Sequence, residues 1–294
     1  MIDRSDEPLP KPAPRDPHSH KGDYGRALIV GGSLGMAGAP ALAGMACLRS
    51  GAGLVSIATP RCVQATVAGY FPAYTTHALP DDGERLTAQA GPAMRQLADE
   101  ADAVAIGPGL GRGAALDELV GAAWSSPKPQ VIDADGLNAL AALRSKLAAP
   151  AGPRVLTPHA GEFARLAGRP LADPNDDTQR REQAAALARS FDGETVVLLK
   201  GPRTVVTNGE RFAVNATGNP GMATGGSGDV LTGVLAALLA QGLPAFDAAR
   251  LAAHVHGLAG DLAAAMLGEV SLTAVDLIDH LPTAWKRTLG EPTN

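Results

Sequence analysis

The chain has 294 residues, 45% of them hydrophobic and only 3% aromatic, and its formal net charge is −5. The negative charge and the lack of a Lys/Arg block argue against nucleic acid as a partner. With only two cysteines, no membrane-length apolar run and no signal-peptide pattern, we expect a soluble, cytoplasmic protein without a membrane partner.

Residues 1–19 hold five prolines among charged residues, which predicts a flexible arm, and a single domain is expected over residues 20–294. From there, short apolar runs typical of strands alternate with longer Ala/Leu patterns typical of helices. We expect strands at 27–30, 54–58, 103–106, 130–132, 154–156 and 196–199. Expected helices are 38–50, 86–98, 114–123, 162–167, 179–189, 230–239, 248–266 and 273–280. This order predicts βαβ units and a mostly parallel sheet covered on both faces, and Asn208-Gly209 predicts an antiparallel hairpin at one edge.

Ligands of open α/β sheets gather at the carboxyl ends of the strands, where the remaining Gly and polar clusters fall. The segment 31–40 resembles a dinucleotide fingerprint only loosely, because the glycine spacing differs. The amides of Gly107-Pro-Gly-Leu-Gly111 could face a ligand, or could form a plain strand-to-helix connection. Asp133 and Asp135 could hold Mg²⁺ through water, or one of them could cap a helix.

The next two strand ends carry a histidine and a lysine. Pro158 is expected to start a helix with His159 in its first turn, where the helix dipole favours a neutral imidazole suited to a polar ligand. An ordinary exposed histidine is the alternative. The run Lys200-Gly-Pro-Arg-Thr204 could bind the phosphates and ribose of a nucleotide, or Lys200 could simply be solvated. His254 and His256 lie two residues apart on an expected helix and do not make a metal pair.

The most informative segment is 215–229, which leads into an apolar helix. Gly225, Gly226 and Gly228 allow positive φ and close approach of an anion to the main chain, and the first amides of the helix point there. A carboxylate at such a place repels the anion, so Asp229 suggests a base that takes a proton from a substrate hydroxyl. The alternative is a helix cap after a flexible loop.

Together these motifs are similar to those of one family. His20-Lys-Gly-Asp-Tyr-Gly-Arg26, Gly31-Gly-Ser33, Gly107–Gly111, Asp133-Ala-Asp-Gly-Leu-Asn138, Leu156-Thr-Pro-His-Ala-Gly-Glu162, Lys200-Gly201 and Gly225-Gly-Ser-Gly-Asp229 resemble, in this order, the ADP-dependent (S)-NAD(P)H-hydrate dehydratases. The resemblance runs from about residue 20 to the end. It implies the ribokinase-like fold, a three-layer α/β/α sandwich with a mostly parallel central sheet and an antiparallel edge hairpin.

The resemblance also implies an activity. Such enzymes use ADP, or ATP in some members, to phosphorylate the ring hydroxyl of hydrated NADH or NADPH, after which phosphate leaves and the reduced cofactor is restored. Mg²⁺ is expected as well, with no ligand set identified, and a homotetramer is expected by resemblance.

Site roles follow residue by residue from the same resemblance. Asp229 is the expected catalytic base, with Gly226, Ser227 and Gly228 as the anion hole. The expected contacts of the hydrated cofactor are Ala39, Gly109, Gly111, His159 and Asp229. The expected contacts of ADP or AMP are Lys200, Gly201, Pro202, Arg203, Thr204 and Gly228.

Many relatives carry an additional N-terminal epimerase domain where this chain has a short Pro-rich segment. We therefore expect dehydration without epimerisation, with a separate NAD(P)H-hydrate epimerase acting in the same pathway. One alternative is a kinase of a small vitamin-precursor alcohol such as hydroxymethylpyrimidine or hydroxyethylthiazole. Another is a nucleotide-binding module without turnover, against which Asp229 argues. The preferences for ADP over ATP and for NADH over NADPH hydrate stay open.

Overall fold

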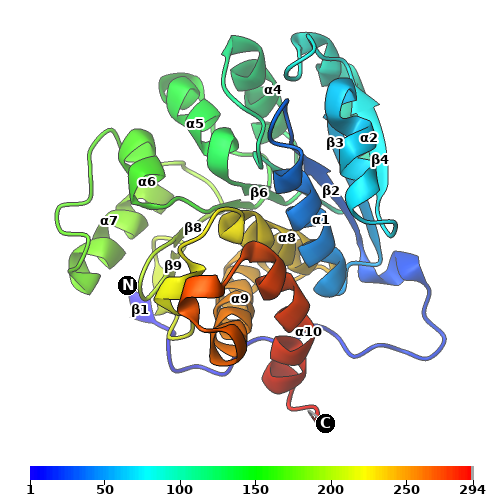
Figure 1. Ribbon diagram of the computed structural model, residues 1–294. Coiled ribbons are helices and arrows are strands. Elements are labelled where there is room, and N and C mark those ends of the chain that lie inside the picture. Colours follow the sequence, from blue (N-terminus) through cyan, green and yellow to red (C-terminus); the bar gives the residue numbers. More distant parts are fainter. Residues whose placement is uncertain (293–294) are drawn as a thin grey trace.

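A computed structural model of the chain describes residues 1–292 and shows a 10-stranded sheet between two layers of helices (Figure 1). The strands are β1 (Ile2–Asp3), β2 (Arg26–Val30), β3 (Leu54–Pro60), β4 (Thr75–Leu79), β5 (Ala103–Ile106), β6 (Gln130–Ile132), β7 (Arg154–Leu156), β8 (Thr195–Leu199), β9 (Val205–Thr207) and β10 (Arg211–Val214). Their order across the sheet is β1-β10-β9-β8-β7-β6-β5-β2-β3-β4.

The strand order places the chemistry-bearing loops side by side. The chain first adds β3 and then β4 on one side of β2. It then returns and pairs β5 with the other edge of β2. β5, β6, β7 and β8 follow in parallel, so the carboxyl ends of β2, β5, β6, β7 and β8 are consecutive neighbours. In open α/β sheets ligands bind where the direction of strand addition reverses, which here is between β2 and β5.

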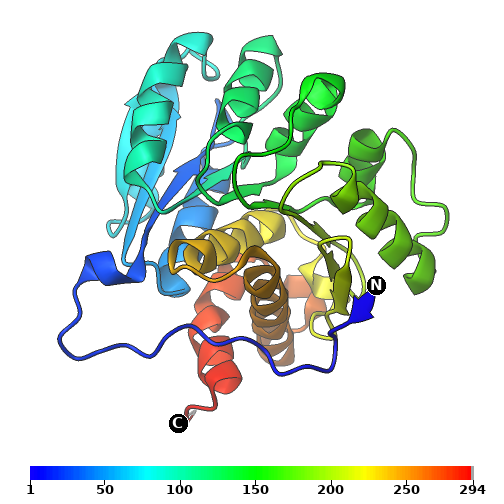
Figure 2. The same cartoon turned by 180° about the vertical axis from the view of Figure 1, so that it is seen from behind.

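Helices cover both faces of the sheet (Figure 2). One layer consists of α3 (Gly91–Glu100), α4 (Ala114–Trp124), α5 (Ala134–Leu143), α6 (Ala160–Ala167) and α7 (Asp177–Arg189). The other consists of α1 (Gly38–Arg49), α2 (Arg61–Tyr70), α8 (Ser227–Ala240), α9 (Ala245–Leu267) and α10 (Ala274–Leu289). Successive strand residues point to opposite layers, so Ile29 packs with α8 and Val30 with the layer of α3 and α4. The predicted three-layer α/β/α architecture is confirmed.

Most predicted elements form, with boundary shifts of a few residues. The expected helix at 86–98 begins later, at Gly91, after a short 3-10 turn at Ala88–Ala90. β4, α2 and α5 were not predicted. β4 begins with Thr75, Thr76 and His77 and therefore lacks an apolar run. None of the helices in residues 1–292 combines enough length with enough apolar character to cross a membrane.

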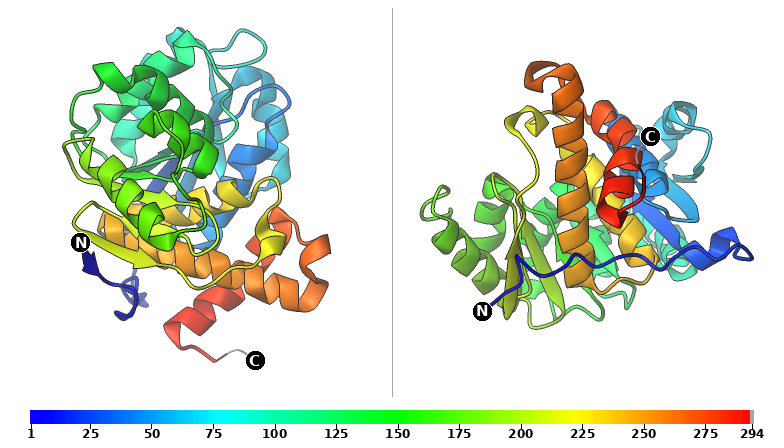
Figure 3. Two further views of the ribbon diagram at one scale, coloured as in Figure 1. Left: turned by 90° about the vertical axis from the view of Figure 1, so that its left-hand side faces the viewer. Right: turned by 90° about the horizontal axis from the view of Figure 1, so that it is seen from below.

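The amino-terminal segment differs from the free arm that its composition predicts. Ile2 N–H donates to the Glu210 carbonyl at 2.9 Å and Arg4 N–H to the Phe212 carbonyl at 2.8 Å, so β1 adds a parallel strand outside the β9–β10 hairpin. The buried guanidinium of Arg250 on α9 donates to the Arg4 carbonyl, and the segment then crosses α9 (Figure 3). Composition missed this placement because the segment is held largely by backbone hydrogen bonds, with Leu9 packing against the core.

Candidate functional site

The loops after five neighbouring strands are hydrogen-bonded to one another at the carboxyl edge of the sheet. Gly32 N–H donates to the Pro108 carbonyl at 2.8 Å, and Ser33 Oγ donates to the Gly109 carbonyl at 2.8 Å. Lys200 N–H donates to the Pro158 carbonyl, also at 2.8 Å. The loops that sequence reasoning singled out therefore form one rim instead of separate turns.

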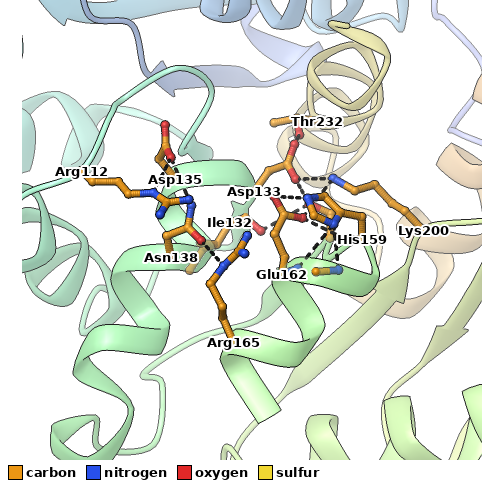
Figure 4. A network of polar contacts seen from close by, with 12 residues as sticks. Arg112, Ile132, Asp133, Asp135, Asn138, His159, Glu162, Arg165, Lys200 and Thr232 are labelled. Carbon is orange, nitrogen blue, oxygen red and sulfur yellow. Dashed lines mark hydrogen bonds and ion pairs between the residues drawn. The ribbon is translucent and has the colours of Figure 1, made fainter. Parts of the chain in front are cut away.

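The buried Asp133 and the partly buried Lys200 form an ion pair below this rim (Figure 4). Lys200 Nζ lies 2.7 Å from Asp133 Oδ1, which also accepts from Thr157 Oγ1 at 2.7 Å, while Thr232 Oγ1 on α8 donates to Oδ2 at 2.8 Å. Burial opposes ionisation of Asp133, but Lys200 and these hydrogen bonds outweigh it and lower the pKa of its carboxyl. Asp133 makes no side-chain cap bond, so the capping interpretation is wrong for this residue. The alternative of a solvated Lys200 is wrong too.

His159 precedes α6 instead of lying in its first turn, because the helix begins at Ala160. Its Nδ1 accepts from Gly161 N–H at 3.0 Å and Glu162 N–H at 3.4 Å, while Glu162 Oε2 accepts from His159 N–H at 2.9 Å. This capping box requires an unprotonated Nδ1 and leaves the side chain 55% exposed beside the rim. Glu162 Oε2 also lies 3.6 Å from Lys200 Nζ, and burial raises the pKa of the Glu162 carboxyl despite that cation.

Asp135 holds the Gly107–Gly111 loop. Its Oδ2 accepts from Gly111 N–H at 2.8 Å, and its Oδ1 accepts from Asn138 Nδ2 at 3.1 Å. Asp133 and Asp135 therefore take different hydrogen-bond partners. Within residues 1–292, no group of three or more His, Cys, Asp and Glu side chains is arranged to hold a metal ion.

Of the three glycines in the anion-hole segment expected to allow positive φ, Gly226 adopts it, and Gly225 and Gly228 do not. Gly226 adopts φ +88° immediately before α8, and a Cβ at Gly225 would meet nothing within 4 Å. At Gly228 a Cβ would lie 3.4 Å from Lys200 Nζ, so the start of α8 is adjacent to the ion pair. The Ser227 carbonyl accepts from Nε2 of the buried His256 at 3.0 Å. Burial lowers the pKa of His256 to about 4, which keeps the imidazole neutral in this role.

Asp229 lies in the first turn of α8, next to the other acidic groups. Burial raises the pKa of its carboxyl to about 7, and the neighbouring charge of Asp133 adds to the effect while Lys200 opposes it. Its ionised and protonated forms are therefore both populated near neutral pH. This is the property that a general base needs, since it must accept a proton and later release it.

The segment Lys200–Thr204 is a tight turn between β8 and β9, and from here on it is called the nucleotide loop after its predicted role. Thr204 Oγ1 donates to the Gly201 carbonyl at 3.1 Å. Arg203 adopts φ +52°, and its Nε lies 2.7 Å from Asp177 Oδ2 in the first turn of α7. The Arg203 side chain thus pairs with α7. On the opposite side of the site, a Cβ at Gly109 would lie 3.1 Å from the Ala39 Cβ, which brings those two predicted cofactor contacts together.

Sequence reasoning missed the roles of Glu162, Thr157, Thr232 and His256. The spacing of His159 and Glu162 is a capping-box signal that could have been recognised, and Thr232 lies one helical turn after Gly228. His256 has no local signal, because only the packing of α9 against α8 brings it to Ser227.

Comparison with known proteins decides the family. The sequence profile described as NAD(P)H-hydrate dehydratase matches residues 27–283. The chain belongs to the NAD(P)H-hydrate dehydratase family.

Relatives of this family support the assignment at the levels of sequence and structure. The bifunctional NAD(P)H-hydrate repair enzyme Nnr of Moorella thermoacetica is 48% identical over 273 residues, which cover 91% of this chain and 50% of that protein. The chain thus spans about half the length of the curated relatives it matches. The ADP/ATP-dependent NAD(P)H-hydrate dehydratase of Bacillus subtilis, co-crystallised with ATP/Mg²⁺, is 32% identical with a TM-score of 0.78, covering 95% of this chain and 94% of that one. A ribokinase-like superfamily protein from Enterococcus faecalis, at 26% identity, has a TM-score of 0.79 over 94% of this chain and 92% of its own. The predicted ribokinase-like fold is confirmed.

Proposed function

We propose that the protein is an ADP-dependent (S)-NAD(P)H-hydrate dehydratase, a hydro-lyase that restores NADH and NADPH from their S hydrates and yields AMP and phosphate. The observation that carries the proposal is the position of Asp229. A carboxyl with a pKa of about 7 stands at the amide-rich start of α8, beside the partly buried Lys200, in a chain of this family.

The proposed chemistry turns a poor leaving group into a good one. Asp229 accepts the proton of the ring hydroxyl while the hydroxyl oxygen attacks the terminal phosphorus of ADP. The bond between that phosphorus and the bridging oxygen breaks, and AMP leaves. The amides of Gly226, Ser227 and Gly228 stabilise charge on the transferring phosphoryl group. The C–O bond then breaks with release of phosphate, and a ring carbon loses a proton to the departing phosphate as the double bond forms, while Asp229 returns the hydroxyl proton to solvent.

The two substrates are proposed to occupy opposite sides of Asp229. Ala39, Gly109, Gly111 and His159 would contact the hydrated cofactor on the side of β2, β5 and β7. The nucleotide loop and Gly228 would contact the adenine nucleotide on the side of β8. The exposed rim position of His159 and the adjacency of Gly228 and Lys200 support this division.

Mg²⁺ is proposed to arrive with the nucleotide, as in the B. subtilis enzyme co-crystallised with ATP/Mg²⁺. Bound Mg²⁺ keeps several waters and uses one or two carboxylates together with phosphates, and it would neutralise charge on the transferring group. Asp133 does not fit as a ligand, because Lys200, Thr157 and Thr232 already occupy its oxygens.

The compartment, the oligomeric state and the partner activity are proposed from the family resemblance and from the names of the relatives. The protein would act in the cytoplasm as a homotetramer, and an epimerase activity would supply the S hydrate from the R form. The M. thermoacetica relative is named as a bifunctional repair enzyme.

The decisive experiment mixes the protein with hydrated NADH, ADP and Mg²⁺ and follows the return of NADH absorbance with the release of AMP and phosphate. Parallel reactions with ATP and with hydrated NADPH establish the two preferences. Failure to recover NADH with either nucleotide would contradict the proposal. Conversion of a vitamin-precursor alcohol to a stable phosphate would favour the kinase, and binding without any turnover would favour the nucleotide-binding module.

Asp229→Asn separates catalysis from binding. We expect no turnover, because the amide cannot accept the hydroxyl proton, while ADP still binds in calorimetry. Turnover close to that of the wild type would show that another group is the base.

A further inference from the structure

We propose that Arg180 on α7 is a positioning residue for the nucleotide loop, and that it sets the affinity for ADP without contacting the reacting atoms. The inference rests on the proposed function in one respect, since it takes Lys200–Thr204 as the nucleotide contact. Arg180 lies outside all the motifs that the sequence brings to attention, and it is buried, with its side chain only 4% exposed.

The buried guanidinium of Arg180 binds the nucleotide loop through the backbone carbonyls of the loop. Arg180 Nη1 donates to the Pro202 carbonyl at 2.5 Å and lies 3.4 Å from the Arg203 carbonyl. A Cβ at Gly201 would lie 3.1 Å from Arg180 Nη2, so the loop backbone also packs directly on the guanidinium. Arginine suits this position because its planar fork presents several donors at once.

These contacts determine where the loop amides point. In a trans peptide the C=O and the following N–H point in opposite directions, and no peptide bond described by the structure is cis. Because the carbonyls of Pro202 and Arg203 face Arg180, the N–H groups of Arg203 and Thr204 point away from it. Within residues 1–292 neither N–H has an acceptor. Two successive free amides around a residue with positive φ form an anion-binding concavity.

The contacts with the nucleotide loop explain why a guanidinium on α7 is buried. The neighbouring buried positions of the helix are apolar, among them Ala184, Leu187 and Ala188. Desolvating a charge there is unfavourable unless its donors find acceptors, and the acceptors are the loop carbonyls and Asp177 Oδ1 at 3.4 Å. Asp177 also contacts the loop directly, because its Oδ2 pairs with Arg203.

The test compares Arg180→Met with Arg189→Met, a matched variant on the same helix. Arg189 Nη1 donates to the Gly209 carbonyl at 2.6 Å, in the turn between β9 and β10 and away from the nucleotide loop. For Arg180→Met we expect KM and calorimetric Kd for ADP to rise on the order of ten- to a hundredfold, because released loop amides no longer hold their geometry. The KM for the hydrated cofactor should stay unchanged. Arg189→Met should retain wild-type values throughout.

Two further variants keep the test decisive if Arg180→Met folds poorly. Arg180→Lys keeps the charge but loses the fork, and ADP affinity should lie between those of wild type and Arg180→Met. Asp177→Asn changes a half-exposed group that binds Arg203, and it should weaken ADP binding alone. Wild-type ADP affinity in folded Arg180→Lys and Asp177→Asn would overturn the inference. If the wild type fails to restore NADH, the proposed function fails, but the calorimetric Kd values still decide the role of Arg180.

Discussion

Asp229 has its pKa set by a local balance of charge. Burial and Asp133 raise it and Lys200 lowers it, so each neighbour can be removed with an opposite expected result. Asp133→Asn should lower the pKa of Asp229 and move the acid limb of kcat/KM to lower pH. Lys200→Met should move that limb to higher pH. Measured pH–rate profiles check both variants, and shifts in the same direction would show that Asp229 does not produce the limb.

The same carboxyl also affects stability. The folded-state pKa of Asp229, about 7, exceeds the unfolded value, so the folded state binds the extra proton and stability falls as the pH rises toward 7. Asp229→Asn removes the cost of ionisation. It should raise the free energy of unfolding by about 1–4 kcal/mol at about pH 8 and by little near pH 4, as measured by chemical denaturation. Equal effects at the two pH values would contradict a raised pKa.

Elements with a strong local pattern could be predicted from the sequence, and elements without one could not. The buried parallel strands are short continuous apolar runs, and α8 and α9 are long Ala/Leu-rich runs, so length and composition reveal them in the sequence. β4 is polar at its start, and α5 begins inside the Asp133 motif, which looks like a loop.

At the same scale, the packing of α8 against α1 depends on one glycine. A Cβ at Gly233 would lie 2.1 Å from the Ala43 carbonyl oxygen, so Gly233→Ala must push the two helices apart. We expect a loss of roughly 1–3 kcal/mol in the free energy of unfolding. Gly69→Ala on α2 is the control, because its Cβ meets nothing within 4 Å, and a helical alanine should add about 0.5–1 kcal/mol. Chemical denaturation of both variants checks the pair, and equal stabilities would refute the close contact.

Over the whole molecule, the site is built from residues far apart in the chain. The sequence placed the Gly and polar loops at strand ends, and the parallel order of the sheet makes those ends neighbours. It could not reveal the Asp133–Lys200 pair or the Asp133–Thr232 bond, whose partners are 67 and 99 residues apart. Such contacts arise from the packing of whole layers, which no local pattern encodes.

The amino-terminal segment connects distant parts of the same fold. Residues 1–19 contact the sheet edge through β10, α9 through Arg250, and the end of α1 through Arg15, whose Nη2 donates to the Gly51 carbonyl at 2.7 Å. Arg250 Nη2 donates to the carbonyls of Arg4 and Glu7 at 2.8 and 2.9 Å, and Arg250 is only 7% exposed. Arg250 therefore attaches this segment to α9 through two hydrogen bonds from a buried donor.

Arg250→Met should release the segment from α9 while leaving the active-site loops in place. We expect faster proteolytic cleavage within residues 1–19, faster hydrogen exchange at Arg4 N–H, and a loss of about 1–3 kcal/mol in the free energy of unfolding, because hydrogen bonds from a buried charged donor disappear. Lys11→Met is the matched control, since Lys11 Nζ makes one exposed contact with the Leu289 carbonyl at 3.3 Å. Equal cleavage rates in wild type and Arg250→Met would mean that the β1–β10 pairing alone retains the segment.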